Sequence, residues 1–395
     1  MSFLVFCSFE VGGLPFKIAE VLNRHGLETY YISAAERRRG HDTTRFHYGR
    51  RKDPWDLSTE LGRFLPAAKK TTATLARLKN KYGFRHCFAT GHKSHLLKES
   101  GLSYKYWSFG SDLDRRSFRP AWPAGHPFFT AAAIYAFWAL NRRNVLASIR
   151  NAEALMISPY QLDAYNKVCP GKPLFFLPHL LPVGDYETLL ERRAENKKEI
   201  GSRIQAQDFF FSATRHFWAG AKARLADNKG NDIILKSFAE YCRLAGRSET
   251  KLVLVKKGLD VGNSQALARD LGLSERIVWL EEMPRGDLDK YYQGASVCFG
   301  QFGTPVLTYA AVEPLGQAAV CVSSYGRAVP EVPFYKEPPP LINSQNPEEI
   351  GRKIADLMRT PKNHLDLGYK SWRWAKDNCS EERFVKSFLE AFGSA

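Results

Sequence analysis

Short apolar runs alternate with segments of helical periodicity along this 395-residue chain. The first such unit joins the apolar run 3–8 to a helical pattern that begins near Pro15 and to a second run, 29–33. Short apolar runs separated by helical segments predict parallel strands joined by crossover helices. Gly12 and Gly13 lie at the first strand-to-helix turn. Glycine at such a turn lets the backbone approach a ligand closely.

The alternation continues through the first half of the chain. The expected elements are a helix over 57–81, strands at 87–90 and 104–108, an apolar helix over 128–140, and strands at 154–158 and 174–177. His92 and Asp112 each follow one of these strands, so both are expected at the carboxyl edge of the sheet, where α/β proteins bind ligands. The alternative for His92 is a structural hydrogen bonder.

The helix expected at 128–140 is the most apolar helical stretch of the chain. It is too short to span a bilayer, which takes about 20 apolar residues. We expect a buried helix. The alternative is a helix that lies at a membrane surface with its aromatic side chains in the lipid boundary.

A very polar helix that reaches residue 200 separates this half from the next, and we place the boundary between two domains at 182/183. The second half opens with the apolar run 209–213, which leads directly into Thr214, Arg215 and His216. A basic residue that ends a buried parallel strand points to the ligand-binding edge of the sheet. The alternative for Arg215 is an ordinary surface cation, and we expect His216 to be a packing or loop residue.

A second basic element, Lys229-Gly230-Asn231-Asp232, begins a helical pattern that continues to Cys242. The unpaired amide groups and the dipole at a helix start favour an anion. Arg215 and Lys229 would therefore flank a diphosphate. Lys222 is the rival of Lys229, and Lys256 and Lys257 follow the next strand and could reach the same edge.

The remaining pattern predicts further strands and helices. Strands are expected at 252–255, 276–280, 298–300 and 319–323, and the final helices at 347–358 and 364–392. Together, the two halves predict an α/β protein of two domains, 1–182 and 183–395.

The ordered series of motifs in the second half resembles the donor-binding domain of GT-B glycosyltransferases of the family 4 type. It comprises Thr214-Arg215-His216, Lys229-Gly230-Asn231-Asp232, Leu271-Gly272-Leu273, Leu288-Tyr291-Tyr292 and Cys298-Phe299-Gly300. The resemblance implies two Rossmann-like domains that face each other across a cleft, with the last helix packed on the N-terminal domain. It also implies that Arg215 and Lys229 bind the diphosphate of a nucleotide sugar and that Gly12 and Gly13 offer backbone amides. His92 and Asp112 would line the acceptor side.

The sequence departs from the family where a pair of glutamates is usual. Gly300 and Thr308 stand at the nearest corresponding places, and neither carries a carboxylate. Glu313 lies within reach of them, and the resemblance assigns the ribose-binding role to Glu313 alone. The motif Gly110-Ser111-Asp112 also resembles a family segment, but Phe109 precedes it where the family commonly has His.

The charge balance is strongly basic: 57 Lys and Arg residues against 41 Asp and Glu give a formal net charge of +16. Such an excess favours polyanions, including anionic lipid and phosphorylated substrates. No nucleic-acid module is recognisable, so no specific nucleic-acid partner is expected. The basic segment 35–56 is expected to be a solvated loop, with an acceptor-facing or membrane-facing surface as the alternative.

Cysteine usage indicates a reducing compartment. The seven cysteines are odd in number, form no Cys-x-x-Cys pair and lie mostly within apolar runs, and the first apolar run has no basic residue before it. We therefore expect reduced buried thiols, no zinc site, no secretory signal and a cytoplasmic protein. Attachment to the inner face of the membrane as a peripheral protein is compatible with this location.

The expected function is that of a retaining, metal-independent glycosyltransferase without a cofactor. The resemblance implies a UDP- or GDP-sugar donor and a glycan or lipid-linked acceptor. Two alternatives remain open at this point: a non-catalytic binding or scaffold protein of the same fold, and a nucleotide-sugar epimerase of the same fold.

Overall fold

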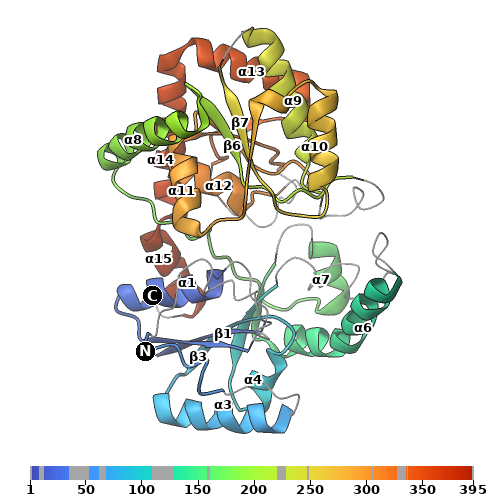
Figure 1. Cartoon of the computed structure of the whole chain (residues 1–395). Coiled ribbons are helices and arrows are strands. Elements are labelled where there is room, and N and C mark those ends of the chain that lie inside the picture. The colour runs from blue at the N-terminus through green and yellow to red at the C-terminus, as the bar shows by residue number, and fades with distance from the viewer. Residues whose placement is uncertain are drawn as a thin grey trace. The chain divides into compact units, whose positions relative to one another are not determined.

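The structure is a computed structural model, and it describes residues 2–8, 13–34, 53–61, 68–108, 128–157, 161–219, 228–246, 249–303, 306–326, 335 and 337–393. The chain divides into two compact units. Unit 1 comprises Met1–Leu177 and Phe384–Ala395, and unit 2 comprises Pro178–Arg383. Each unit is built on one parallel sheet flanked by helices, which confirms the predicted α/β class (Figure 1). The boundary at Leu177/Pro178 lies close to the one placed at 182/183.

The sheet of unit 1 has the strand order β2-β1-β3-β4-β5. Its strands are β1 (Phe3–Cys7), β2 (Thr29–Ser33), β3 (His86–Thr90), β4 (Tyr104–Trp107) and β5 (Ala154–Met156), and its helices include α1 (Leu14–Arg24), α3 (Ala68–Tyr82), α4 (His95–Glu99), α6 (Phe128–Asn151) and α7 (Leu162–Val168). Phe3 pairs in parallel register with Thr29 on one side and with His86 on the other. Every residue of β1 is buried, as expected of a central parallel strand covered on both faces.

The end of the chain belongs to unit 1. α15 (Glu381–Ala391) places the Phe388 ring 5.3 Å from the Phe3 ring and 4.7 Å from the Phe392 ring. The prediction of one helix over 364–392 is wrong: α14 (Pro361–Cys379) ends before Ser380. Ser380 is extended, and its Oγ accepts a hydrogen bond from the Arg383 amide at 3.3 Å. The serine therefore begins a new helix.

The sheet of unit 2 has the strand order β11-β10-β9-β6-β7-β8. Its strands are β6 (Phe209–Ser212), β7 (Lys251–Val255), β8 (Ile277–Leu280), β9 (Val297–Phe299), β10 (Val320–Ser323) and β11 (Ile342–Asn343). Its helices are α8 (Tyr186–Ile204), α9 (Asn231–Ala245), α10 (Val261–Asp270), α11 (Arg285–Gly294), α12 (Tyr309–Gly316), α13 (Pro347–Arg359) and α14, with the 3₁₀ turn η4 (Ser274–Arg276).

Alternating residues of β6 pack into opposite helical layers of unit 2. Phe210 joins the core cluster that contains side chains of α9, α10 and α13. Phe209 and Phe211 join the cluster that contains side chains of α8 and α11. Because successive side chains of a strand point to opposite faces, the triple phenylalanine fills both layers, with the two helical layers on either side of the sheet (Figure 1).

One predicted strand is absent from the sheet. Of the segment 174–177, only Leu174 forms an isolated bridge, to Leu155. Phe175 donates its amide to the Leu155 carbonyl at 2.9 Å, on the far side of this single bridge. All seven cysteines are free thiols, and only Cys242 is not buried.

Candidate functional site

The strand order of unit 2 reverses between β6 and β9. From β6 the chain adds β7 and β8 on one side and then returns to add β9, β10 and β11 on the other. At such a reversal the loops leave in opposite directions, and ligands of open α/β sheets bind there at the carboxyl ends of the strands. Ser212 Oγ donates to the Phe299 carbonyl at 3.0 Å and Thr214 Oγ1 to the Gly300 carbonyl at 3.2 Å. The ends of β6 and β9 are thereby fixed together at this point.

The buried side chain of Asn231, which is 1% exposed, ties the loop after β6 to the start of α9. Its Oδ1 accepts the Phe217 amide at 3.2 Å, and its Nδ2 donates to the Thr214 carbonyl at 3.3 Å. The Lys229 amide donates to the Phe217 carbonyl at 2.8 Å. Arg215 lies within the tied loop, so the structure places the backbones that carry Arg215 and Lys229 side by side.

The N-terminus of α9 has no side-chain cap among the described residues. Gly230 precedes the helix in the left-handed conformation with φ 66°. A Cβ on Gly230 would come within 2.6 Å of the Phe302 Cβ, so glycine is required both by its conformation and by this close approach. The first amides of α9 carry the partial positive charge of the helix dipole. Lys229 therefore stands beside a second source of positive potential.

The loop after β7 supports Arg215 from the other side. Lys257 offers its carbonyl to the His216 amide at 2.6 Å. A Cβ on Gly258, which has φ 113°, would lie 2.7 Å from the Arg215 Cγ. The base of the Arg215 side chain therefore rests on Gly258, while the residue as a whole is exposed. This contact fixes the start of the side chain and leaves its guanidinium accessible.

Ion pairing separates the cations at this edge. Lys256 pairs with Glu281, and Lys257 pairs with Glu282 at 2.9 Å. In the part of the chain that the structure describes, no carboxylate forms an ion pair with Arg215. Unlike Lys256 and Lys257, Arg215 is thus not neutralised by a carboxylate of the described residues. Lys222, the rival of Lys229, lies outside the described residues.

His216 and Trp218 are structural, as expected for His216 from the sequence. Ser264 Oγ lies 2.8 Å from His216 Nδ1 and accepts a hydrogen bond from Trp218 Nε1 at 2.8 Å. The Trp218 indole N–H donates to this hydroxyl, which keeps a second lone pair, so the tautomer of the imidazole decides whether the hydroxyl donates to Nδ1 or accepts from it. Burial lowers the pKa of His216 to about 4.

Glu313, the residue assigned to the ribose, is 8% exposed within α12. Its carboxylate pairs with the guanidinium of Arg285, which also contacts Asp289 at 3.1 Å. Burial raises the pKa of Glu313 and the Arg285 charge opposes that rise. The carboxylate is therefore engaged within the protein. Sequence reasoning missed Arg285, because only its pair with Asp289 follows helical spacing.

The two places where the glutamate pair was sought lie at the end of β9 and at the start of α12. The Gly300 amide donates to the Val322 carbonyl at 2.8 Å, and a Cβ there would come within 2.8 Å of Ser323 Oγ. Thr308 precedes α12, and its buried Oγ1 has no hydrogen-bond partner among the described residues. A glutamate at position 300 would thus require the neighbouring strand to shift.

The sheet of unit 1 reverses its strand order between β1 and β3, and two predicted residues follow these strands. Gly13 precedes α1 with φ 71°, and His92 follows β3. Burial lowers the pKa of His92 to about 4, so its imidazole is neutral near pH 7. The Ser8 side chain joins the two loops by accepting the Lys93 amide at 2.9 Å. Gly12 and Asp112 lie outside the described residues.

Comparison of the sequence with known proteins gives a match to a family model and a match to a relative. Residues 213–374 match the family model "Glycosyl transferases group 1". Over 167 residues, the chain is 26% identical to a GDP-mannose-dependent alpha-(1-6)-phosphatidylinositol monomannoside mannosyltransferase of Mycolicibacterium smegmatis. This match covers 40% of the chain and 42% of that relative, so it spans less than half the length of either protein.

Solved structures match over the whole chain. Sucrose-phosphate synthase of Thermosynechococcus elongatus has a TM-score of 0.62 at 13% identity, and HepE of Anabaena, in complex with UDP, has 0.61 at 11%. WaaG, a glycosyltransferase of lipopolysaccharide biosynthesis, has 0.57 at 14%. Each match covers 100% of both chains. At these identities the likeness shows the fold alone, which is that of GT-B proteins, with two parallel-sheet domains.

Proposed function

We propose, from the premise that residues 213–374 are a domain of the glycosyl transferases group 1 family, that this protein is a glycosyltransferase that uses a nucleotide-diphosphate sugar. One observation carries the proposal. At the strand-order reversal of unit 2, Asn231 ties the loop of Arg215 to the helix start beside Lys229, which no described side chain caps. The names of the relatives mention GDP-mannose and UDP, which supports a GDP- or UDP-sugar donor.

The chemistry needs positive charge at this edge. When the bond between the sugar and the diphosphate breaks, the departing diphosphate gains negative charge. Arg215, Lys229 and the first amides of α9 would stabilise that charge, and preorganised groups of this kind are often the largest contribution to catalysis. These cations would supply the charge without a metal ion. Retention of the anomeric configuration and membership of family 4 are part of the proposal and rest on the resemblance.

The other predicted residues have defined parts in this scheme. Glu313 would bind the ribose while keeping its contact with Arg285, and Gly12 and Gly13 would offer amide groups to the donor. His92 and Asp112 would line the acceptor side, and the acceptor would be a glycan or a lipid-linked intermediate. We place the protein in the cytoplasm, with peripheral attachment to the inner face of the membrane.

A thermal-shift series tests the binding step. UDP, GDP and their sugars are added to the wild-type protein, to Arg215→Ala, to Lys229→Ala and to the control Arg269→Ala. Arg269 is an exposed cation in the last turn of α10, at the opposite edge of the sheet. We expect one diphosphate to stabilise the wild type and the control but neither site variant. Equal stabilisation of all four proteins would show that the diphosphate binds elsewhere.

A second assay tests transfer, with labelled donor and a lipid extract as the source of acceptor. We expect the label to move to the extract, with roughly 10²-fold slower transfer in each site variant, a loss typical of one stabilising donor. The absence of carboxylates at Gly300 and Thr308 favours the scaffold as the second candidate. A scaffold would bind the nucleotide without transfer, and an epimerase would convert the donor sugar in the absence of the extract.

A further inference from the structure

α6 presents one exposed stripe that changes character along the helix. Phe128 is 69% exposed, Phe129 85% and Tyr135 38%. Further along the helix, Arg142, Arg143 and Arg150 are exposed, while Val145, Ser148 and Ile149 are buried against unit 1. The positions 128, 135, 139, 142, 146 and 150 recur at intervals of three, four or seven residues, so they lie on one face. We call this face, together with Phe129 beside it, the α6 stripe.

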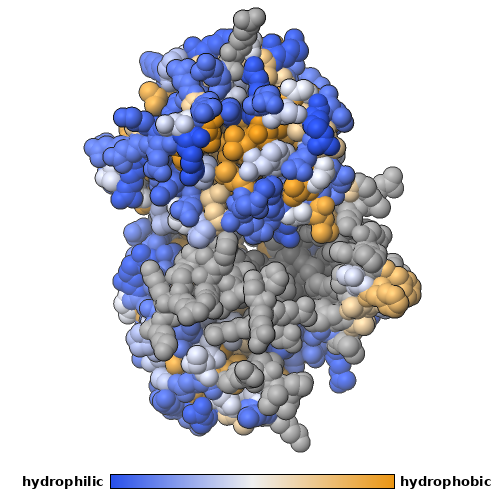
Figure 2. Space-filling view, viewed as in Figure 1, coloured by the Kyte–Doolittle hydropathy of each residue, from blue (hydrophilic) through white to orange (hydrophobic). Residues whose placement is uncertain are grey.

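The aromatic half of the α6 stripe is visible as a hydrophobic patch over the outer end of α6 (Figure 2). The two phenylalanine rings contact each other edge to face at 5.7 Å. The sequence led us to expect a buried helix here, and for these phenylalanines that expectation is wrong. Leaving such large aromatic side chains in water is unfavourable, which is why exposed apolar patches mark surfaces that meet another apolar phase.

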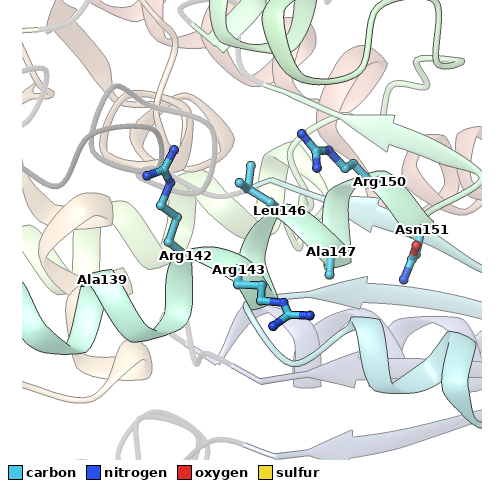
Figure 3. A pocket seen from close by; sticks show the side chains of 7 residues that line it. All are labelled: Ala139, Arg142, Arg143, Leu146, Ala147, Arg150 and Asn151. Carbon is cyan, nitrogen blue, oxygen red and sulfur yellow. The ribbon is translucent and has the colours of Figure 1, made fainter.

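The basic half of the α6 stripe lines a pocket. Its described lining residues are Ala139, Arg142, Arg143, Leu146, Ala147, Arg150 and Asn151. Arg142 and Arg150 extend to the same side with Leu146 between them, and Arg143 extends to the other side (Figure 3). α6 contains no acidic residue, and no carboxylate pairs with these three arginines within the described ranges. The positive charge of this half is therefore not neutralised locally.

We infer that the α6 stripe docks on an anionic lipid bilayer. Aromatic side chains at one end would enter the boundary between headgroups and acyl chains, and Arg142 and Arg150 would bind lipid phosphates with Leu146 between them. Charge complementarity favours an anionic bilayer as the binding partner, because a stripe without any carboxylate suits a surface of uniform negative charge. None of the described helices is long and apolar enough to cross a membrane, so the contact would be peripheral.

This inference does not depend on the sugar chemistry proposed above. The acceptor could be soluble and the α6 stripe could still bind lipid. Donor binding is therefore measured on every variant by the thermal shift with nucleoside diphosphate. A variant that changes vesicle binding but not the thermal shift tests the α6 stripe alone. A variant that changes the thermal shift but not vesicle binding tests only the proposed transferase site.

The test is sedimentation of the full chain with vesicles of phosphatidylcholine, alone or mixed with phosphatidylglycerol, at low and at high salt. We expect binding to the mixed vesicles only, weakened by salt. Arg142→Gln/Arg150→Gln should lower the partition coefficient about 30-fold, because each basic residue near an anionic surface contributes about 1 kcal/mol. Phe128→Ser/Phe129→Ser should lower it at both salt concentrations, since burial of apolar surface is not screened.

The matched control is Arg192→Gln/Arg269→Gln, which removes the same charge from exposed positions of unit 2. It should bind vesicles within a few-fold of the wild type. Equal loss in the control would overturn the inference, because net charge alone would then explain binding. Equal binding to both kinds of vesicle would do the same, as would a phenylalanine variant that dissociates a dimer in solution while leaving lipid binding intact.

Discussion

A strand-end cation can serve a ligand only when the protein does not already neutralise it, and this separates Arg215 from Lys256 and Lys257. The two lysines pair with Glu281 and Glu282. Arg215 rests on Gly258 and has no ion pair with a described carboxylate. The sequence gives all three residues the same local setting, at the end of an apolar run. The two lysines differ from Arg215 only in their ion-pair partners, Glu281 and Glu282, which follow a different strand.

Glu313 offers a test at the level of a single side chain. Glu313→Gln leaves Arg285, whose side chain is 28% exposed, with Asp289 as its remaining carboxylate, which should lower the free energy of unfolding by about 1–3 kcal/mol. Denaturant titration measures the loss. If Glu313 also binds the ribose, the variant should lose affinity for UDP or GDP but keep its affinity for pyrophosphate, measured by calorimetry. A parallel loss for both ligands would make Glu313 a structural residue.

His216 should make stability depend on pH. Its pKa is about 4 in the folded protein against 6.5 ordinarily, so between these values the unfolded chain binds a proton that the folded chain does not. Stability should therefore fall as the pH drops from 6.5 to 4, by about 3 kcal/mol for this group. His216→Gln, which cannot titrate, should show a shallower decline in denaturant titrations across this range. An unchanged slope would mean that His216 becomes protonated in the folded state.

At the carboxyl edge of the sheet in unit 2, side chains of one loop form hydrogen bonds with backbone groups of another loop. Asn231 connects the start of α9 with the loop after β6, and Thr214 connects that loop with the end of β9. Removing one such tie changes the position of a whole segment, because each loop carries a residue of the proposed site.

Asn231→Asp should separate the two loops. The carboxylate can still accept the Phe217 amide, but it cannot donate to the Thr214 carbonyl and would repel it. We expect a loss of about 1–3 kcal/mol in unfolding free energy, the cost of a buried group without its partner. Nucleoside diphosphate binding should weaken by more than this loss of folded protein explains. Weakened folding with intact affinity for the nucleotide would contradict the positioning role.

The local sequence pattern predicts well where helices and strands lie, but it predicts poorly which distant residues contact each other. The strands β6 and β7 and the start of α9 follow from apolar runs and from Gly230 ahead of a helical period. The break at Ser380 was missed, because a serine within a helical period is tolerated and its capping role depends on where the next helix packs. The pair of Glu313 with Arg285 joins residues of two different helices, and no sequence spacing encodes it.

Across the whole molecule, the two units differ in the number of chain segments that form them. Unit 2 is one continuous segment, whereas unit 1 needs Phe384–Ala395 in addition to Met1–Leu177. Phe388 is fully buried in unit 1, with its ring 5.3 Å from that of Phe3 and 6.0 Å from that of Phe88. The aromatic cluster therefore joins the first strand to the last helix.

Phe388→Ala should destabilise unit 1 selectively. Truncating a fully buried phenylalanine costs about 3–5 kcal/mol through lost burial and a residual cavity. Calorimetry should show an earlier unfolding transition for unit 1, and nucleoside diphosphate should still raise the transition of unit 2. A single transition that shifts as a whole would mean that the units unfold together. Ser387→Ala, a small change beside Phe388, serves as the control.

The return of the last residues to unit 1 has a consequence for biosynthesis. A ribosome releases the chain from the amino end, so the segment Pro178–Arg383 is complete before Phe384–Ala395 emerges. Unit 2 can thus fold while unit 1 still lacks its last helix. A chain truncated after Arg383 and released from the ribosome should therefore resist protease over Pro178–Arg383 and be cut within Met1–Leu177.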